Sequence, residues 1–516
     1  MFDQSFSSTE FKEIFDNENR KGNDLENKFK NEFIESLKLI PQLKASNLKI
    51  KQETDKNNLI VLLEERKEIK ANRVAAINNI LKIASTNIQA KINNLKLLQG
   101  PLNGTKPTYR IEPRLENVLM LKKLQYNVFK TYKVVQSSRH AILSQFINLI
   151  SDTLPKYVVR VDLSSFYERI PQIQLRKKIT EDHLLNVSSK KLITKILDEY
   201  NKLTSQIDIN TAQGVPRGVG ISSYLSELFM RDIDNKIKRM DDLVYYARYV
   251  DDMIIVFVPK TITVQKRELK NYETKTFNII KESGMIVNDK KSESYNLVMK
   301  KDGLTEIHYR TQEFFDNQLI KSSLKRKPKV ITYLGYQFSA TKTVYKFSDP
   351  ESNQKVNIDL AIDLSDKKLT KYKTKIRLSF DAFKNKKTSN YNRAFKLLYS
   401  RILYLTSNTQ LKNNKSRVLV GVYYSNPFIH NSTSLLELDK FLKWHISRAG
   451  LIIRDKEKLI KLNFSNGFLE KKTCQFPIKK RKYKHHNSRK KDPINTLNNG
   501  IVQFGLMEIN SIWKRS

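Results

Sequence analysis

The chain has 516 residues, 39% of them hydrophobic, and its 94 Lys and Arg outnumber its 53 Asp and Glu to give a net charge of +41. Such a surplus repels itself in a compact molecule unless a polyanion neutralises it, so nucleic acid is the expected partner. The single cysteine, Cys474, excludes a disulfide scaffold and cysteine-cluster zinc sites. No stretch approaches the roughly 18 consecutive apolar residues of a membrane span, and no signal-peptide pattern opens the chain, so we expect a cytoplasmic protein without membrane contact.

Residues 1–105 are predicted to form a helical N-terminal region. Apolar residues recur there at the spacing of one helix face, which predicts a long helix or a helix pair. They are Leu59, Leu62, Leu63, Ile69, Val74, Ile77, Leu81 and Ile88. This face either packs on the next region or forms an oligomerisation surface, and the pattern does not separate the two. The turn chemistry of residues 100–107 marks the boundary.

Residues 106–340 contain two apolar strands that each meet a carboxylate. Residues 157–161 form an apolar run that ends at Asp162. Later, β-branched and aromatic residues flank Asp251 and Asp252 on both sides, which predicts strand, tight turn, strand. An isolated Asp-Asp pair is more often a solvated turn. Adjacent hard oxygen ligands between apolar strands, however, suit Mg²⁺ or Mn²⁺.

Three further stretches accompany these strands. Residues 215–220 are a glycine-containing turn that opens an amphipathic helix, which we expect Ser222 or Ser223 to cap. Residues 284–292 and residues 333–338 follow the Asp pair in the chain.

Together these stretches resemble the ordered motifs of reverse transcriptases. Asp162 resembles the motif A aspartate, residues 215–222 motif B, and Tyr-Val-Asp-Asp at 249–252 motif C. Residues 284–292 are similar to motif D, and residues 333–338 to the primer-grip motif E. The resemblance covers about residues 110 to 340. It implies an α+β right-hand polymerase fold in which fingers and palm, an antiparallel sheet backed by helices, occupy residues 106–340.

Residues 341–516 are expected to form a helical thumb and a basic C-terminal extension. Helical patterns run over residues 370–382, 392–405 and 434–445. The extension carries the run Lys479, Lys480, Arg481, Lys482 and Tyr483, where cations with an interleaved ring suit single-stranded nucleic acid. A solvated loop is the alternative.

The resemblance implies a two-metal nucleotidyl transfer site. Its Mg²⁺ ions, with Mn²⁺ as the alternative, would be held by Asp162, Asp251, Asp252 and the Leu163 carbonyl. Tyr167 occupies the position that closes against the sugar 2′-carbon and excludes ribonucleotides. Residues that would contact the incoming deoxynucleotide are Tyr167, Arg217, Gly218, Lys291 and Arg139. Residues that would contact primer or nucleic acid are Tyr333, Leu334, Gly335, Lys325 and Arg326, together with the C-terminal basic run.

Two arginines leave alternatives open. Arg139 lies at an expected helix start, where a cation is unfavourable unless it binds phosphate or forms a surface salt bridge. Arg217 stands where most reverse transcriptases have glutamine. It could pair with the triphosphate, contact a base, or form a structural bridge to Glu168 or Glu227.

Details of motifs A and B resemble those of bacterial antiphage defence reverse transcriptases, the unknown-group and abortive-infection lineage. This resemblance implies a structured non-coding RNA partner, a DNA product, a homo-oligomer and, in some members, a second reverse transcriptase subunit. RNA-directed DNA synthesis is therefore the expected function. The rivals are a template-independent or self-primed DNA polymerase on the same palm, and a nucleic-acid-binding protein with an inactive palm.

Overall fold

The computed structural model describes residues 2–151, 154–258, 266–299, 305–309, 330–340, 360–411, 418–430, 432–476 and 504–513. Its strands are β1 (Leu97–Gln99), β2 (Tyr109–Ile111), β3 (Lys156–Asp162), β4 (Leu243–Tyr249), β5 (Asp252–Phe257), β6 (Glu293–Met299), β7 (Thr305–Tyr309), β8 (Ile331–Tyr333), β9 (Tyr336–Ala340), β10 (Leu360–Leu364), β11 (Asn408–Gln410) and β12 (Leu419–Gly421). Within the described residues they form sheets in the orders β4-β5-β3-β6-β7, β10-β9-β8, β1-β2 and β11-β12. The strand pairs whose direction is known are antiparallel, as the sequence predicted.

The chain divides into two compact units, each described here by itself. Unit 1 comprises residues 1–138, 159–260 and 265–293, and unit 2 comprises residues 139–158, 261–264 and 294–516. The helices of unit 1 are α1 (Ser8–Arg20), α2 (Leu25–Lys28), α3 (Ile34–Gln52), α4 (Lys56–Ser85), α5 (Ile88–Asn93), α6 (Leu115–Tyr132), the 3-10 turn η1 (Phe166–Glu168), α8 (Gln172–Glu181), α9 (Val187–Leu203), α10 (Ile221–Lys238) and α11 (Lys266–Glu282).

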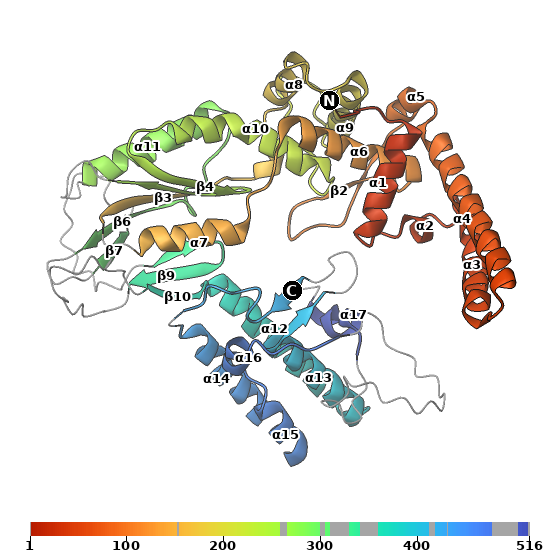
Figure 1. Cartoon of the computed structure of the whole chain (residues 1–516). Helices are drawn as coiled ribbons and strands as arrows, with labels where there is room; N and C mark the ends of the chain where they lie inside the picture. Colours follow the sequence, from red (N-terminus) through yellow and green to blue (C-terminus); the bar gives the residue numbers. More distant parts are fainter. Residues whose placement is uncertain are drawn as a thin grey trace, which may run out of the picture. The chain divides into compact units, whose positions relative to one another are not determined.

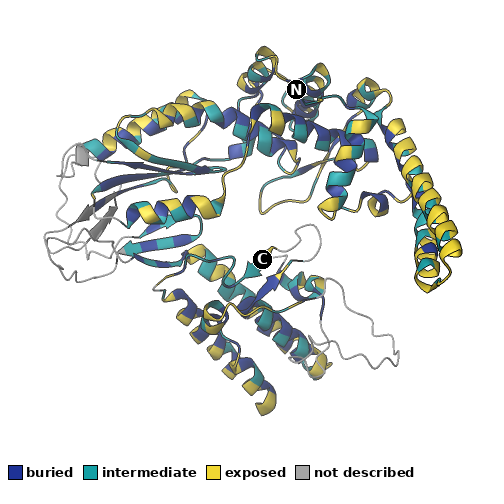
Figure 2. Ribbon diagram, viewed as in Figure 1, coloured by how far each residue is buried: buried dark blue, intermediate teal, exposed yellow. Residues whose placement is uncertain are grey.

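The expected N-terminal helix pair exists as α3 and α4, which lie side by side (Figure 1). Its expected apolar face is only partly buried, and the choice between packing on the next region and an oligomerisation surface stays a prediction. Ile77 and Leu81 are buried near the end of α4, where that helix meets α1 and α6. Leu63 and Val74 are 40% and 48% exposed, and most of the pair is exposed in Figure 2.

The centre of unit 1 is the strand pair β4–β5 with the helices that cover it. Tyr249 pairs with Asp252 at the turn, and the side chains of β5 from Met253 to Phe257 are fully buried. Helices α10 and α11 lie on one face of this sheet (Figure 1), and α10 buries Leu225, Leu228 and Ile233. A helix with an apolar stripe over a buried strand makes the core on which the carboxylate-bearing turns rest.

The start of α10 differs from the expectation in one detail. Its N-cap is Gly220, and neither expected serine caps it. Ser222 Oγ instead donates to the Pro216 carbonyl at 2.7 Å, and Ser223 Oγ donates to the Gly220 carbonyl at 3.2 Å. The hydroxyls therefore bind the preceding turn, because the chain enters the helix through a tight loop that brings its carbonyls within reach.

Unit 2 combines a small sheet with a helical bundle. Its helices are α7 (Arg139–Ile150), α12 (Asp366–Lys384), α13 (Tyr391–Thr406), α14 (Ser434–Ser447), α15 (Ile453–Ile460), α16 (Phe464–Leu469) and α17 (Leu506–Ile509), followed by the 3-10 turn η3 (Asn510–Trp513). Helices are confirmed at the three ranges expected after residue 341, as α12, α13 and α14, and α12 packs on both of the others. Their assignment to a thumb stays a prediction. The Trp513 indole N–H donates to the Lys375 carbonyl at 3.1 Å, which ties η3 to α12. No helix in the described part of the chain has the length and apolar character needed to cross a membrane.

Candidate polymerase site

The turn between β4 and β5 carries the Asp pair. Val250 adopts a left-handed backbone conformation, φ 61°, which is costly for a β-branched residue. Arg248, at the end of β4, donates to the Val250 carbonyl at 3.1 Å and makes paired hydrogen bonds to Glu227 and Asp234 of α10. The strained turn is therefore fixed to the helix behind it.

The same turn is joined to the end of β3, which carries Asp162. Strand β5 lies next to β3 in the sheet. The Leu163 backbone N–H donates to the Asp251 carbonyl at 3.0 Å. The two carboxylate-bearing turns that the sequence places 89 residues apart are thus adjacent.

The stretch that resembles motif D wraps around Asp162. Asn288 Nδ2 donates to Asp162 Oδ1 at 2.9 Å, and the Asn288 N–H donates to the Asp162 carbonyl at 2.8 Å. Lys291 Nζ lies 3.6 Å from Asp162 Oδ1, and the lysine side chain is 64% exposed. Lys291 therefore lies beside a candidate metal ligand with its stem in solvent, free to follow a bound anion.

The three carboxylates repel one another. Burial raises the pKa of Asp251, and the charge of Asp162 adds to that rise, while Lys106 and Lys291 oppose it. Burial also raises the pKa of Asp252, to about 6, against the lowering effect of Arg160. Carboxylate pKa values raised by burial and by mutual repulsion are the condition that a bound divalent cation relieves.

Asp252 is held by an arginine of the neighbouring strand. Arg160 Nε and Nη2 donate to Asp252 Oδ1 and Oδ2 at 3.1 and 3.3 Å. Among the described residues, no three acidic, His or Cys side chains are arranged as a ready metal-ligand cluster. The donor set available to a hard cation is Asp162 and Asp251, with Asp252 available only if its arginine releases it.

Arg217 forms the structural bridge that was one of its three interpretations. Its Nε and Nη2 donate to the two carboxylate oxygens of Glu168 at 2.8 and 3.0 Å. Its guanidinium carbon lies 4.9 Å from the ring centroid of Tyr167. Glu227, the other acid considered, pairs with Arg248 instead. Contact of Arg217 with a nucleotide stays a prediction.

Gly218 is required where it stands. Its φ is 96°, and a Cβ there would lie 2.9 Å from the Tyr109 carbonyl oxygen. The loop before α10 can therefore approach β2 only with glycine at this position.

Three contributors to this part of unit 1 were missed by sequence reasoning. They are Arg160, Asn288 and Lys106, whose Nζ lies 3.7 Å from Glu168 Oε2 and which lowers the pKa of Asp251. The alternation of strand side chains was a usable signal for Arg160, because it stands two residues before Asp162 on the same face. For Lys106 and Asn288 the sequence offered no signal beyond their place in a turn or motif.

The stretch that resembles motif E is a hairpin in unit 2. Strands β8 and β9 are joined by Leu334 and Gly335, with φ values of 43° and 79°. Arg139, the first residue of α7, donates through Nε and Nη2 to the Leu334 carbonyl. Its guanidinium lies 5.3 Å from the Tyr336 ring centroid, and Lys368 Nζ lies 5.1 Å from the same centroid. Two cations therefore share one ring beside this turn.

Several expected contact residues lie outside the described residues. They are Lys325, Arg326, Lys479, Lys480, Arg481, Lys482 and Tyr483. Their roles stay predictions.

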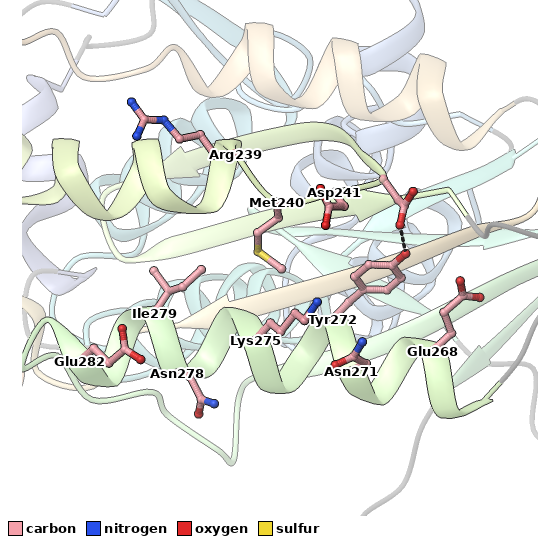
Figure 3. Close-up of a pocket in the computed structure, with 11 residues that line it drawn as sticks. Arg239, Met240, Asp241, Glu268, Asn271, Tyr272, Lys275, Asn278, Ile279 and Glu282 are labelled. Atoms are coloured by element: carbon pink, nitrogen blue, oxygen red, sulfur yellow. Dashed lines mark hydrogen bonds between the residues drawn. The ribbon is translucent and has the colours of Figure 1, made fainter.

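A surface cavity of about 590 Å³ lies between the end of α10 and α11 (Figure 3). Met240 and Ile279 line it together with charged side chains, and the Tyr272 hydroxyl donates to Asp242 in its wall. None of the expected site residues lines it. The cavity is mixed in charge and separate from the carboxylate turns.

Comparisons with known proteins agree with the motifs. Residues 75–338, just over half of the chain, match the family model described as Reverse transcriptase (RNA-dependent DNA polymerase). No curated protein sequence matches the chain.

Three similar solved structures have low TM-scores. Telomerase from Candida albicans with a fragment of telomeric RNA is 12% identical, with 77% of this chain and 75% of that chain covered and a TM-score of 0.33. Truncated apo telomerase from Candida tropicalis is 14% identical, with 55% and 69% covered and a TM-score of 0.26. A structure titled "RdRp complex" is 10% identical, with 42% and 22% covered and a TM-score of 0.26.

Proposed function

Because this chain belongs to the reverse transcriptase family, an RNA-directed DNA polymerase family, we propose that its palm performs two-metal nucleotidyl transfer with Asp162 and Asp251 as the principal metal ligands. The right-hand polymerase fold expected from the motifs is confirmed, and the chain is a nucleotidyltransferase. The observation that carries the proposal is the junction of the two carboxylate turns through the hydrogen bond from Leu163 to Asp251.

The donor set suits a hard divalent cation. Asp162 and Asp251 supply carboxylate oxygens, and the Leu163 carbonyl would add a neutral ligand. Asp252 is the weaker ligand in this proposal, because Arg160 already holds both of its oxygens. Two such ions, Mg²⁺ or Mn²⁺, supply charge neutralisation for the attacking and leaving oxygens of the reaction.

The chain's own residues prepare the substrates. Asn288 orients the Asp162 carboxylate, and Lys291, which lies 3.6 Å from that carboxylate, would bind the leaving pyrophosphate. Tyr167 would close against C2′ of the sugar and reject a 2′-hydroxyl by volume, which makes DNA the product. Gly218 keeps the loop before α10 close to β2, so that its backbone could support the incoming nucleotide.

The hairpin of unit 2 is proposed as the primer contact. Arg139 and Lys368 flank the turn at Leu334 and Gly335. Burial is the larger cause of the lowered pKa of Lys368, and the nearby charge of Arg139 lowers that pKa further. A phosphodiester group would relieve this repulsion between like charges. Arg139 therefore suits primer phosphate better than the incoming nucleotide, because its guanidinium is bound to this hairpin.

The biological setting is proposed from the family details of motifs A and B and from the charge of +41. We propose that the enzyme acts in bacterial antiphage defence, in the cytoplasm, with a structured non-coding RNA as partner. A homo-oligomer or a second reverse transcriptase subunit belongs to the same proposal. Sequencing the nucleic acid that copurifies with the protein tests it: unrelated cellular RNA in every preparation would contradict a dedicated RNA.

Primer extension tests the chemistry. The protein is supplied with an RNA template, an annealed DNA primer, the four deoxynucleotides and Mg²⁺ or Mn²⁺, and the product is sequenced. We expect DNA complementary to the RNA, and a loss of roughly a thousandfold in rate for Asp251→Asn, since the ion site supplies several kcal/mol. Asp198→Asn is the matched control and should retain activity, because it alters a carboxylate of α9 that pairs with Arg176 of α8.

The rival functions give different results in the same assay. DNA whose sequence ignores the supplied RNA would favour a template-independent or self-primed polymerase. RNA binding without synthesis under any condition would favour a binding protein with an inactive palm.

A further inference from the structure

Arg217 and Glu168 form an ion pair that joins two separate segments of unit 1. Glu168 ends the 3-10 turn that also contains Tyr167, and Arg217 lies in the loop before α10. The two hydrogen bonds measure 2.8 and 3.0 Å, and the side chains are 22% and 26% exposed. Burial acts against ionisation of Glu168, but the hydrogen bonds and charge of Arg217 hold its pKa below the ordinary value. Both groups are therefore charged near neutral pH.

The Arg217 side chain of the pair lies against the ring of Tyr167. The Arg217 guanidinium lies 4.9 Å from that ring's centroid, and the Phe166 ring meets Tyr167 edge-on with centroids 5.1 Å apart. The ring therefore has an aromatic neighbour from its own turn and a cationic neighbour from the other segment. A planar guanidinium can donate two hydrogen bonds along one edge while its face lies against an aromatic ring, and glutamine cannot do both.

The backbones of both segments are fixed independently of this pair. The Val215 N–H donates to the Tyr167 carbonyl at 2.8 Å, and the Tyr109 N–H donates to the Arg217 carbonyl at 2.7 Å. Loss of the Arg217 side chain would therefore leave the main chain in position and free mainly the Tyr167 ring. The consequence of such a loss should appear in what the ring does and less in whether the unit folds.

We propose that Arg217, held by Glu168, is a positioning residue that fixes the Tyr167 ring and thereby sets the preference for deoxynucleotides over ribonucleotides. This inference rests on the proposed function, in which Tyr167 excludes the 2′-hydroxyl. A steric gate discriminates by volume only if the ring cannot turn aside, because a mobile ring makes room for one extra oxygen. We call the Tyr167 ring the gate, and the Arg217–Glu168 pair that holds it in place the clamp.

The test compares catalytic efficiency with a ribonucleotide and with the matching deoxynucleotide. For Arg217→Gln and for Glu168→Gln we expect the ratio of ribonucleotide to deoxynucleotide efficiency to rise roughly tenfold, a size typical of a loosened steric contact. The double variant should rise no further than either single variant, because both remove the same clamp. Arg217→Lys keeps the charge without the planar fork and should also raise the ratio.

The matched control is Arg176→Gln, which removes another arginine of unit 1 from an ion pair, with Asp198 at 2.7 Å. Its ratio should equal that of the wild type. Melting curves accompany every variant. If Arg217→Gln does not fold, Glu168→Gln and Arg217→Lys decide, because each keeps one member of the pair or its charge.

The outcomes separate failure of this inference from failure of the proposed function. If Tyr167→Ala raises the ratio and the Arg217 and Glu168 variants do not, the clamp is wrong and the gate stands. An equal loss of efficiency for ribonucleotides and deoxynucleotides in Arg217→Gln would make Arg217 a substrate-binding group and overturn the clamp. An unchanged ratio in Tyr167→Ala overturns the gate and the clamp together, and absence of any synthesis by the wild type overturns the proposed function itself.

Discussion

Arg160 and Asp252 form a two-pronged ion pair across neighbouring strands, with Nε to Oδ1 at 3.1 Å and Nη2 to Oδ2 at 3.3 Å. The Arg160 and Asp252 side chains are 13% and 17% exposed. Arg160 Nη1 also lies 3.5 Å from Glu293 Oε2. The second aspartate of the pair is thus neutralised from within the sheet. A cation at the carboxylate turns would therefore bind Asp162 and Asp251 more strongly than Asp252.

Replacing Arg160 should expose the cost of burying Asp252. Arg160→Met leaves that carboxylate with little compensation, and we expect the free energy of unfolding to fall by about 3 kcal/mol. Urea denaturation measures the loss. The double variant Arg160→Met with Asp252→Asn should recover most of it, because the buried side chain at position 252 is then neutral. An equal loss in the double variant would mean that Arg160 acts through packing alone.

Arg248 should matter more to stability than any other arginine beside the turn. It is 7% exposed and bridges Glu227, Asp234 and the Val250 carbonyl. Arg248→Met leaves two carboxylates without their cation, and we expect a loss of about 4 kcal/mol in thermal or urea unfolding. Tyr246→Phe is the control, since it removes only one hydrogen bond to Asp234, at 2.6 Å, and should cost about 1 kcal/mol. Equal losses would contradict the bridging role.

The carboxylate turns were predictable because a strand, a turn and a second strand each depend on residues that are close together in the sequence. Apolar runs end at Asp162 and surround Asp251, and the ordered motifs told which strands would become neighbours. The helix predicted over residues 434–445 is α14, which spans Ser434–Ser447. Periodicity and turn chemistry suffice for elements of this kind.

The ion-pair partners of the arginines could not be predicted from the sequence. Arg248 could have paired with many acids, and its choice depends on which face of α10 lies against β4. The partner of the apolar face of α4 was beyond the sequence for a related reason. Its apolar spacing predicts a face but not a partner, and the described residues cover that face only near Ile77 and Leu81. Tertiary contacts decide both outcomes.

Lys368 should give unit 2 a pH dependence of stability. Burial, with the nearby charge of Arg139, lowers its pKa from 10.5 to about 8. Between these two values the unfolded chain binds more protons than the folded one, so stability rises with pH from about 8 to about 10.5. Lys368→Met should abolish this rise and be the more stable form near pH 7, as urea denaturation across pH would measure. A parallel rise in wild type and variant would assign the dependence to another group.

The left-handed backbone of Val250 makes a last prediction about the turn itself. At φ 61° a valine carries strain of about 1 to 2 kcal/mol that glycine does not, while glycine costs about 1 kcal/mol through the greater freedom of the unfolded chain. The free energy of unfolding of Val250→Gly should therefore equal that of the wild type or exceed it by up to about 1 kcal/mol. Val256→Gly, the same change at a fully buried β5 residue, should cost about 3 kcal/mol or more. Primer extension by Val250→Gly should nevertheless slow, because a looser turn holds the Asp251 carboxylate less well against β3. Similar destabilisation at both positions would show that the left-handed conformation stores no strain in this turn.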